Sequence, residues 1–289
     1  MTIDVKWLDT HKWGIRSSND GVSYGSFAWA PLGEWTEPFV WDPFPACGGG
    51  LHVETPKYHG FRMLYSRPEL IEYKGDCVGL TDKAKGGRAR IVAVGTDVPD
   101  AAFERCGYRV AHDGMIISPL PHERWTVLAG VVSINHQSGG ECRAYGDATL
   151  NVNASQHDGE CYAYGDAMLN VNVSQLGGIC SAYNNAVLNV HAQQRGGECG
   201  AFGHATLNVN ASQLDGECSA FGRATLNVNA SQLDGVCSVY SNAEMNVHAS
   251  QLGGECHVYD NAVLRIYAPR QGGECWVHSL AIVRRHVDP

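Results

Sequence analysis

The stretch CRAYGDATLNVNASQHDGE, residues 142–160, is followed directly by CYAYGDAMLNVNVSQLGGI, residues 161–179, and variants of this pattern recur to the end of the chain. Cysteine recurs with a spacing of 19 residues at positions 142, 161, 180, 199, 218, 237, 256 and 275. A period of this length is typical of a solenoid, in which each repeat buries its apolar face only by stacking on its neighbours. The sequence therefore predicts a β-solenoid of eight coils.

Apolar and polar residues alternate within each repeat. We call the residues at one position of successive repeats a column and name it by its first member. The alternating apolar columns begin at Ala148, Leu150, Val152 and Ala154. A period of two predicts a β-strand with one buried face, and a second, shorter strand brings Cys142 and Ala144 inward. Parallel strands lie about 4.8 Å apart, so eight coils extend roughly 38 Å.

Two columns mark the turns between strands. The Gly146 column contains Gly, Asn, Ser and Asp, which suit a left-handed backbone. Gly159 and its six successors are all glycine, which indicates a sharp second corner. In the last repeat Arg285 falls in the inward Val152 column, where a charge is costly, so we expect the solenoid to end there.

Composition divides the chain into two domains. We predict a small, strand-rich capping domain over residues 1–124 and a solenoid over 125–289, with residues 125–141 as a lead-in coil before the eight repeats. Residues 139–289 hold 14 acidic residues against 7 arginines and no lysine, whereas residues 1–138 hold 16 acidic against 14 basic residues. An acidic solenoid repels nucleic acid and anionic membranes, so the expected partner is a protein or a second copy of the chain.

The chain shows no membrane or export signal. No segment approaches 18 consecutive apolar residues, and the start, MTIDVKWLD, lacks signal-peptide character. The expected location is the cytoplasm of a host cell, or a virion.

The regular cysteines form a ladder rather than disulfides or a metal site. In-register parallel strands hold equivalent Cβ atoms about 4.8 Å apart, outside the usual disulfide range of roughly 3.5 to 4.5 Å. A single column of parallel side chains does not surround a metal tetrahedrally. We therefore expect buried, reduced thiols, with no metal and no cofactor.

Outward columns form straight rows that are candidate binding surfaces. The aromatic row contains Tyr145, Tyr164, Tyr183, Phe202, Phe221, Tyr240 and Tyr259. Rings spaced by one coil mostly pack on each other, which favours a structural role, although they are also able to stack on a sugar or a nucleobase. The asparagine row contains Asn151, Asn170, Asn189, Asn208, Asn227 and Asn246, and we expect its amides to bond along the stack.

Two further surface features are candidates for binding a partner. Glu198, Asp215 and Glu217 are candidates for contact with a basic partner. Rows of small polar residues also resemble ice-binding surfaces, but the Thr149 column includes Met168 and Glu244, and this irregularity counts against ice.

The amino-terminal region contains five of the seven tryptophans and one sharp motif, GSFAWAPLGEWTEPFVWDPFPACGGGLHV, residues 25–53. Cys47 before three glycines is able to face a nest of backbone N–H groups, with His52 as a base, which is the minimum for nucleophilic catalysis. The alternative is that Cys47 and the glycines shape a tight turn while His52 bonds locally.

This motif resembles an uncharacterised domain family of bacteriophage and actinobacterial proteins. The matching residues are Trp29, Pro31, Trp41, Asp42, Pro43, Pro45, Cys47, Gly48, Gly49, Gly50, Leu51 and His52, followed more loosely by the segment from Lys83 to Val94. The resemblance covers about residues 22–105 and implies a phage origin but no activity. The family's tails are often short repeats rich in glycine and alanine, from which the 19-residue coils depart.

The sequence favours a non-enzymatic structural or interaction protein of phage origin that presents a rigid acidic surface to a protein partner or within a virion. One alternative is an enzyme centred on Cys47 and His52 with the solenoid as a targeting arm. Another is an ice- or glycan-binding solenoid.

Overall fold

A computed structural model describes residues 3–18, 22, 27–44, 50–58, 67–135, 139–267, 270–278 and 281–286. The chain divides into two compact units, Met1–Val110 and Ala111–Pro289, which are considered separately. In both units the regular secondary structure is mostly strand, as the sequence predicts. Among the described residues, no helix has both the length and the apolar content needed to cross a membrane.

The first unit contains two small antiparallel sheets and short helical segments. One sheet has the strand order β1 (Trp13–Ser18), β4 (Arg67–Tyr73), β7 (Ala89–Val94), β2 (Trp35–Thr36), and the other has the order β3 (Leu51–Val53), β6 (Ala84–Gly86), β5 (Cys77–Gly79). The helical segments are α1 (Val5–Thr10), η2 (Gly95–Asp97) and α2 (Asp100–Arg105).

A buried ion pair lies within the first unit. The Arg16 guanidinium lies 3.7 Å from the ring centroid of Trp29 and pairs with the fully buried carboxylate of Glu69. Ser18 and Arg67 also donate hydrogen bonds to Glu69 Oε1, at 2.5 and 3.1 Å. A buried carboxylate needs such partners, because an unpaired charge in this position would be strongly destabilising.

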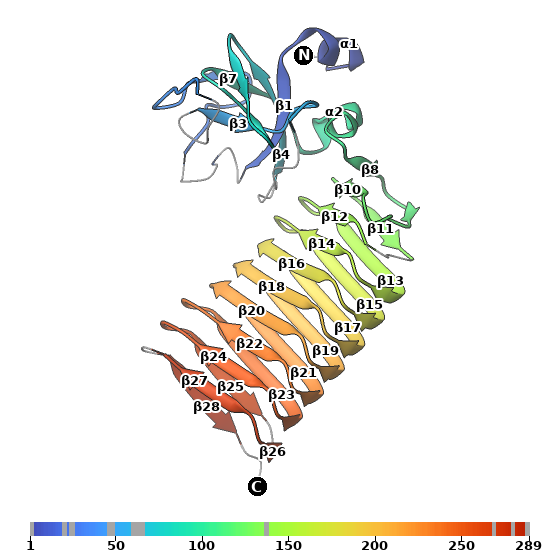
Figure 1. Ribbon diagram of the computed structural model, residues 1–289, viewed down its shortest axis with the longest axis vertical. Helices are drawn as coiled ribbons and strands as arrows, with labels where there is room; N and C mark the ends of the chain where they lie inside the picture. The colour runs from blue at the N-terminus through green and yellow to red at the C-terminus, as the bar shows by residue number, and fades with distance from the viewer. Residues whose placement is uncertain are drawn as a thin grey trace. The chain divides into compact units, whose positions relative to one another are not determined.

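The second unit is a solenoid with two parallel sheets, seen in Figure 1 as a regular stack of coils. The first sheet contains β8 (Arg109–Ala111), β10 (Arg124–Val127), β12 (Glu141–Ala144), β14 (Glu160–Ala163), β16 (Ile179–Asn184), β18 (Glu198–Gly203), β20 (Glu217–Gly222), β22 (Val236–Val239), β24 (Glu255–Val258) and β27 (Glu274–Val277). The second contains β9 (Ile116–Ile117), β11 (Val131–Ile134), β13 (Thr149–His157), β15 (Met168–Leu176), β17 (Val187–Arg195), β19 (Thr206–Leu214), β21 (Thr225–Leu233), β23 (Glu244–Leu252), β25 (Val263–Tyr267), β26 (Arg270–Gln271) and β28 (Ile282–His286).

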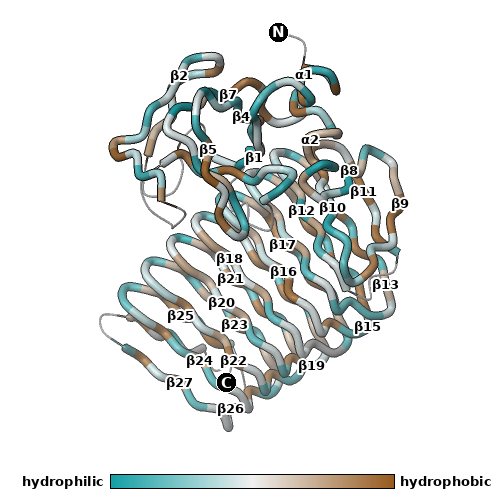
Figure 2. The backbone as a smooth tube through the Cα atoms, turned by 45° about the horizontal axis from the view of Figure 1, so that its top comes forward, coloured by the Kyte–Doolittle hydropathy of each residue, from teal (hydrophilic) through white to brown (hydrophobic). Residues whose placement is uncertain are grey.

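The predicted 19-residue register is confirmed. Cys142 pairs with Cys161 in the first sheet, and Leu150 pairs with Leu169 in the second. The Ala148, Leu150 and Val152 columns are buried as far as Ala262, Leu264 and Ile266, and Figure 2 shows the alternation of hydropathy along the coils. The backbone register also places Arg285 opposite Ile266, at the end of the Val152 column.

The solenoid begins earlier than the sequence indicates. The boundary predicted at 124/125 lies inside the second unit, because β8 and β9 already add strands to the two sheets. In the lead-in coil, Trp125 pairs with Cys142 and Val132 with Leu150, so the spacings are 17 and 18 residues rather than 19. The lead-in coil at residues 125–141 was predicted, but the coil of β8 and β9 before it lacks the regular cysteine, and periodicity alone does not reveal it.

The Gly146 column has the predicted left-handed backbone. Its φ angles lie between 57° and 79° from Gly146 to Asp260, and the members that are not glycine are Asn184, Ser241 and Asp260. Asparagine and aspartate tolerate this conformation better than other residues with a side chain, whereas serine is a strained substitute.

The Gly159 column has a different explanation from the one predicted. None of the glycines from Gly159 to Gly273 in this column has a positive φ. A Cβ on Gly178, Gly197 or Gly216 would instead lie 2.1–2.2 Å from the carbonyl oxygen of the glycine one coil earlier. The column is glycine because adjacent coils approach closely here, and the sharp corner is not the reason.

Candidate binding surfaces and the amino-terminal site

The asparagine row forms a continuous hydrogen-bonded ladder, as predicted. Each side-chain amide donates through Nδ2 to Oδ1 of the asparagine one coil earlier, and all five bonds from Asn170 to Asn246 are 2.9 Å long. At the last coil Arg265 Nη1 donates to Asn246 Oδ1 at 3.1 Å and pairs with Glu244. The ladder therefore ends on a charged donor rather than on an unmatched acceptor.

The aromatic row is a continuous stack. Neighbouring rings from Tyr145 to Tyr259, and on to His278, have centroids 4.3–5.2 Å apart and planes within 14° of parallel. Tyr145 and Tyr164 are buried, whereas Tyr183, Phe202, Phe221, Tyr240 and Tyr259 are half-buried. Since each ring face covers the next, a ligand at this row would meet ring edges rather than faces, and the stack acts mainly as a support.

The three acidic candidates lie on the surface. Glu198 and Glu217 are direct neighbours on β18 and β20, and both are exposed. Asp215 is exposed two residues before Glu217, between β19 and β20. We call these three side chains the acidic surface. A rigid backbone holds their like charges close together, which favours a basic partner or counter-ions.

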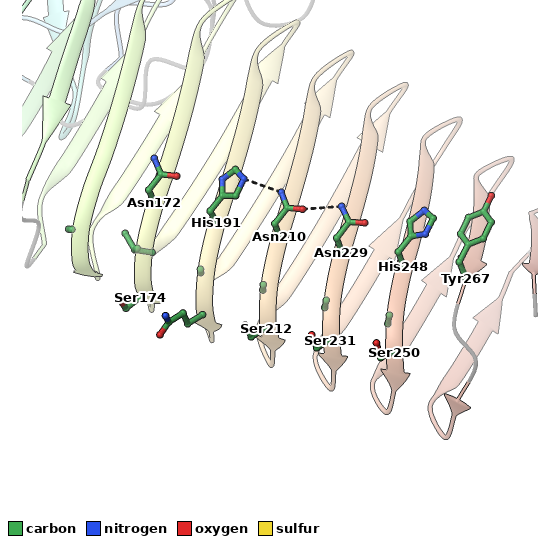
Figure 3. A pocket seen from close by; sticks show the side chains of 17 residues that line it. Asn172, Ser174, His191, Asn210, Ser212, Asn229, Ser231, His248, Ser250 and Tyr267 are labelled. Atoms are coloured by element: carbon green, nitrogen blue, oxygen red, sulfur yellow. Dashed lines mark hydrogen bonds between the residues drawn. The ribbon is translucent and has the colours of Figure 1, made fainter. Parts of the chain in front are cut away.

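A groove that sequence reasoning missed crosses the outer side of the second sheet. It has a volume of about 870 Å³ and is lined from Ala154 on β13 to Tyr267 on β25. One wall is the row Asn172, His191, Asn210, Asn229, His248 and Tyr267, and the other is Ser174, Gln193, Ser212, Ser231 and Ser250. Between the walls lie the small residues of the Ala154 column. Figure 3 shows the first wall as a line of side chains along the axis.

The groove arises from a break in the strand alternation. Ala154 pairs with Val173 and Gln156 pairs with Gln175, but Ser155 has no register partner in this ladder. The exposed Ser155 and Gln156 are followed by the buried His157, so the strand bends here. In the sequence, the two consecutive polar residues of each repeat were the signal that could have revealed the bend.

The cysteine ladder is buried and not joined by disulfides. Cys142 to Cys256 are at most 2 % exposed, and only Cys275 of the ladder is half-buried. Burial, together with the neighbouring Cys161 thiol, raises the pKa of Cys142 well above its ordinary value. The Cys142 thiol is therefore protonated at neutral pH, and the buried thiols of the ladder act as small apolar side chains.

We expect this burial to protect the thiols from a water-soluble reagent. Under native conditions, titration with Ellman's reagent should modify Cys275 and Cys77, which are both half-buried, well before Cys142 to Cys256. In denaturant all 11 cysteines of the chain should react. Rapid native modification of all eight ladder thiols would contradict the buried ladder.

The amino-terminal candidates are only partly described. His52 lies on β3 opposite Lys85 of β6, and its Nε2 is enclosed with no hydrogen-bond partner among the described residues. Burial and the charges of Lys83 and Lys85 lower the pKa of His52 from 6.5 to about 4, against a smaller opposite effect of Asp82. Cys47 lies outside the described residues, so its predicted meeting with His52 stays a prediction.

The lowered pKa of His52 predicts a loss of stability in mild acid. Between pH 6.5 and about 4 the unfolded chain binds a proton at this position and the folded chain does not. The free energy of unfolding should therefore fall as the pH is lowered through this window. Urea unfolding followed by tryptophan fluorescence at pH 7, 5.5 and 4.5 should show a smaller fall for His52→Gln than for the wild type. The variant His204→Gln, at an exposed site of the solenoid, should follow the wild type.

Comparison of the chain with protein-family models, with curated proteins and with solved structures gives no match. The resemblance of residues 22–105 to a phage domain family therefore stays a hypothesis, and function has to be argued from the surfaces themselves.

Proposed function

We propose that this chain is a non-enzymatic interaction protein whose solenoid presents the acidic surface, at fixed spacing, to a basic protein partner. The observation that supports this most directly is the unbroken register from β12 to β27, which holds Glu198, Asp215 and Glu217 exposed on a rigid backbone. Preorganised charges increase the rate and the specificity of association more than they increase the affinity.

The amide ladder and the aromatic stack support the same proposal. Both cross successive coils without a gap, so a force on one coil is resisted by its neighbours through hydrogen bonds of 2.9 Å and stacked rings. Such a scaffold loses little conformational entropy on binding.

The phage origin, and with it a place in a virion or in the host cytoplasm, depends on the WDPFPACGGGLH motif at residues 41–52 alone.

The proposal predicts binding that is weakened by salt and by loss of the acidic surface. The full chain serves as bait, and a protein captured from host lysate is then measured in purified form. Its affinity should fall steeply between 50 mM and 1 M salt. The combined change Glu198→Gln, Asp215→Asn and Glu217→Gln should weaken binding about tenfold, since three exposed pairs contribute roughly 0.5 kcal/mol each.

Two controls sharpen this experiment. Glu255→Gln with Glu274→Gln removes exposed charges from the same column further along the solenoid, and should change the affinity less than the triple variant does. Cys47→Ala should have no effect. A partner that survives 1 M salt and the triple change, but is lost with Cys47→Ala or His52→Gln, would overturn the proposal.

A second candidate is an enzyme centred on Cys47 and His52. The observation that favours it is the strongly lowered pKa of His52 together with its enclosed Nε2, because perturbed pKa values cluster at functional sites. The same binding experiment separates the two candidates, because only the enzyme depends on these two side chains.

A further inference from the structure

The groove differs in chemistry from the rest of the solenoid. None of the 17 residues that line it in the described part of the chain is Asp, Glu, Lys or Arg. Residues 139–289 as a whole carry 14 acidic residues and 7 arginines. A long recess without charged groups on an acidic solenoid suits a ligand that is polar and uncharged.

The first wall carries hydrogen-bonding groups in fixed positions. Asn229 Nδ2 donates to Asn210 Oδ1 at 3.1 Å, and Asn210 Nδ2 lies 3.4 Å from His191 Nε2. Each amide has two N–H donors and an oxygen with two lone pairs, so a bond along the axis leaves a second N–H and a second lone pair for a ligand. The dashed lines of Figure 3 follow these bonds. Because the bonds orient the amides, binding would cost little side-chain entropy.

The geometry of the groove selects an extended ligand. It spans six steps between coils, roughly 29 Å at about 4.8 Å a step. The same kinds of groups recur on the five coils from β15 to β23: an amide or ring on one wall, a hydroxyl or amide on the other, and an alanine or valine between them. A ligand with hydroxyl groups repeated along its length would meet equivalent partners at every coil.

We propose that this groove binds a linear, uncharged glycan chain lying along the solenoid axis. Sugar hydroxyls donate and accept hydrogen bonds, as do the asparagine, serine and glutamine groups of the two walls. Five alanines and Val173 lie between the walls, so no long side chain fills the space there, and the ring of Tyr267 at the carboxy-terminal end, which stacks on His248, adds an apolar edge. The side chains along the first wall, asparagine, histidine and tyrosine, differ in length and shape, which makes the surface a poor match to a regular ice plane.

This glycan site goes beyond the proposed acidic function. The acidic residues lie on β18, on β20 and in the turn before β20, whereas the groove crosses strands of the other sheet. The first surface acts through charge, and the groove acts through neutral hydrogen bonds. The two sites are therefore expected to respond differently to salt and to substitution.

The test is isothermal titration calorimetry of the full chain against neutral hexasaccharides: cellohexaose, xylohexaose, laminarihexaose, maltohexaose and chitohexaose. We expect at least one to bind with a Kd of about 1 mM or tighter. The double change Asn210→Leu and Asn229→Leu keeps side-chain size but removes the wall's amides, and should weaken binding at least tenfold. An increase of salt from 50 mM to 1 M should change the Kd less than twofold.

A matched control lies on the same two strands outside the groove. Thr206→Val with Thr225→Val removes two outward hydroxyls from β19 and β21, and should leave glycan binding within twofold of the wild type. The triple variant of the acidic surface should also bind glycan normally, so failure of one proposal does not imply failure of the other.

Three results would overturn the glycan site. The first is that none of the five hexasaccharides binds. The second is that binding is equal in the wild type and in the folded Asn210→Leu, Asn229→Leu variant, with folding checked by circular dichroism. The third is that the wild type binds no glycan but causes thermal hysteresis of ice growth, and that the same variant abolishes this hysteresis. That result would make the groove an ice-binding surface.

Discussion

Gly197→Ala should destabilise the solenoid by about 3 kcal/mol or more, the largest effect that we expect from a single methyl group in this protein. The added Cβ would lie 2.2 Å from the carbonyl oxygen of Gly178, far inside van der Waals contact. That oxygen is fixed, because it accepts a hydrogen bond of 3.1 Å from the backbone N–H of Glu198. Relief of the clash would require two coils to separate. The midpoint of thermal unfolding, followed by circular dichroism, should fall by roughly 6–12 °C.

The preceding residue provides a matched control. A Cβ on Gly196 would meet no atom within 4 Å, and its φ lies outside the left-handed region. Gly196→Ala should therefore change stability by no more than about 0.5 kcal/mol, and restriction of the unfolded chain favours a small gain. Similar losses in the two variants would show that inter-coil contact does not explain the glycine column.

Ala205→Leu should be the second most damaging change, with a loss of roughly 1–3 kcal/mol in the free energy of unfolding. Ala205 has no exposed surface, and neither have Ala186 and Ala224, its equivalents in the adjacent coils. The three extra carbon atoms therefore meet a core that is already filled, and strands fixed by pairing on both edges have little freedom to move apart.

His204→Ala provides the comparison for this site, because His204 is exposed and only one residue away. It should cost no more than about 0.5 kcal/mol, as expected for a surface substitution. Chemical unfolding of both variants measures the difference. Equal losses would mean that the Ala205 side chain does not face the core.

The repeat could be predicted from sequence because its physical cause is local and recurs. Alternation with a period of two identifies the inward columns, and the 19-residue spacing brings identical residues into contact. The left-handed turn column was predictable for the same reason, since Gly, Asn, Ser and Asp share one position. The amide ladder followed from asparagine in a strand, where a stack of identical residues provides each amide with a partner.

The groove was not predicted from the sequence, because the regular alternation of the repeats conceals the bend that forms it. The strand from Thr149 to His157 appears in sequence as continuous alternation up to Ala154, and the bend at Ser155 changes which side chains face outward. Alternation predicts a face but not a change of direction. The glycine column was predicted but attributed to the wrong cause, because a close approach between coils is not distinguishable from a sharp turn by residue type alone.

The first unit was less predictable because its contacts are not local. β1 pairs with β4 across about fifty residues of chain, with Ser18 opposite Arg67, and no periodicity marks such a pairing. The buried contact between Arg16 and Glu69 likewise joins distant segments. The sequence motif at residues 41–52 identified His52 as unusual, but only the structure shows the burial and the two lysines that lower the pKa of its imidazole.

The 19-residue register of the solenoid limits the ways in which the length of this protein can change. Deletion of any complete 19-residue unit between Cys161 and Cys256 would bring each strand against an equivalent partner, so amide would again meet amide and ring would again meet ring. Insertion of one unit would do the same. A deletion that is not a multiple of 19 residues would place side chains of one column against those of another. The solenoid is thus modular, and its length can vary in whole coils while every lateral surface keeps its chemistry.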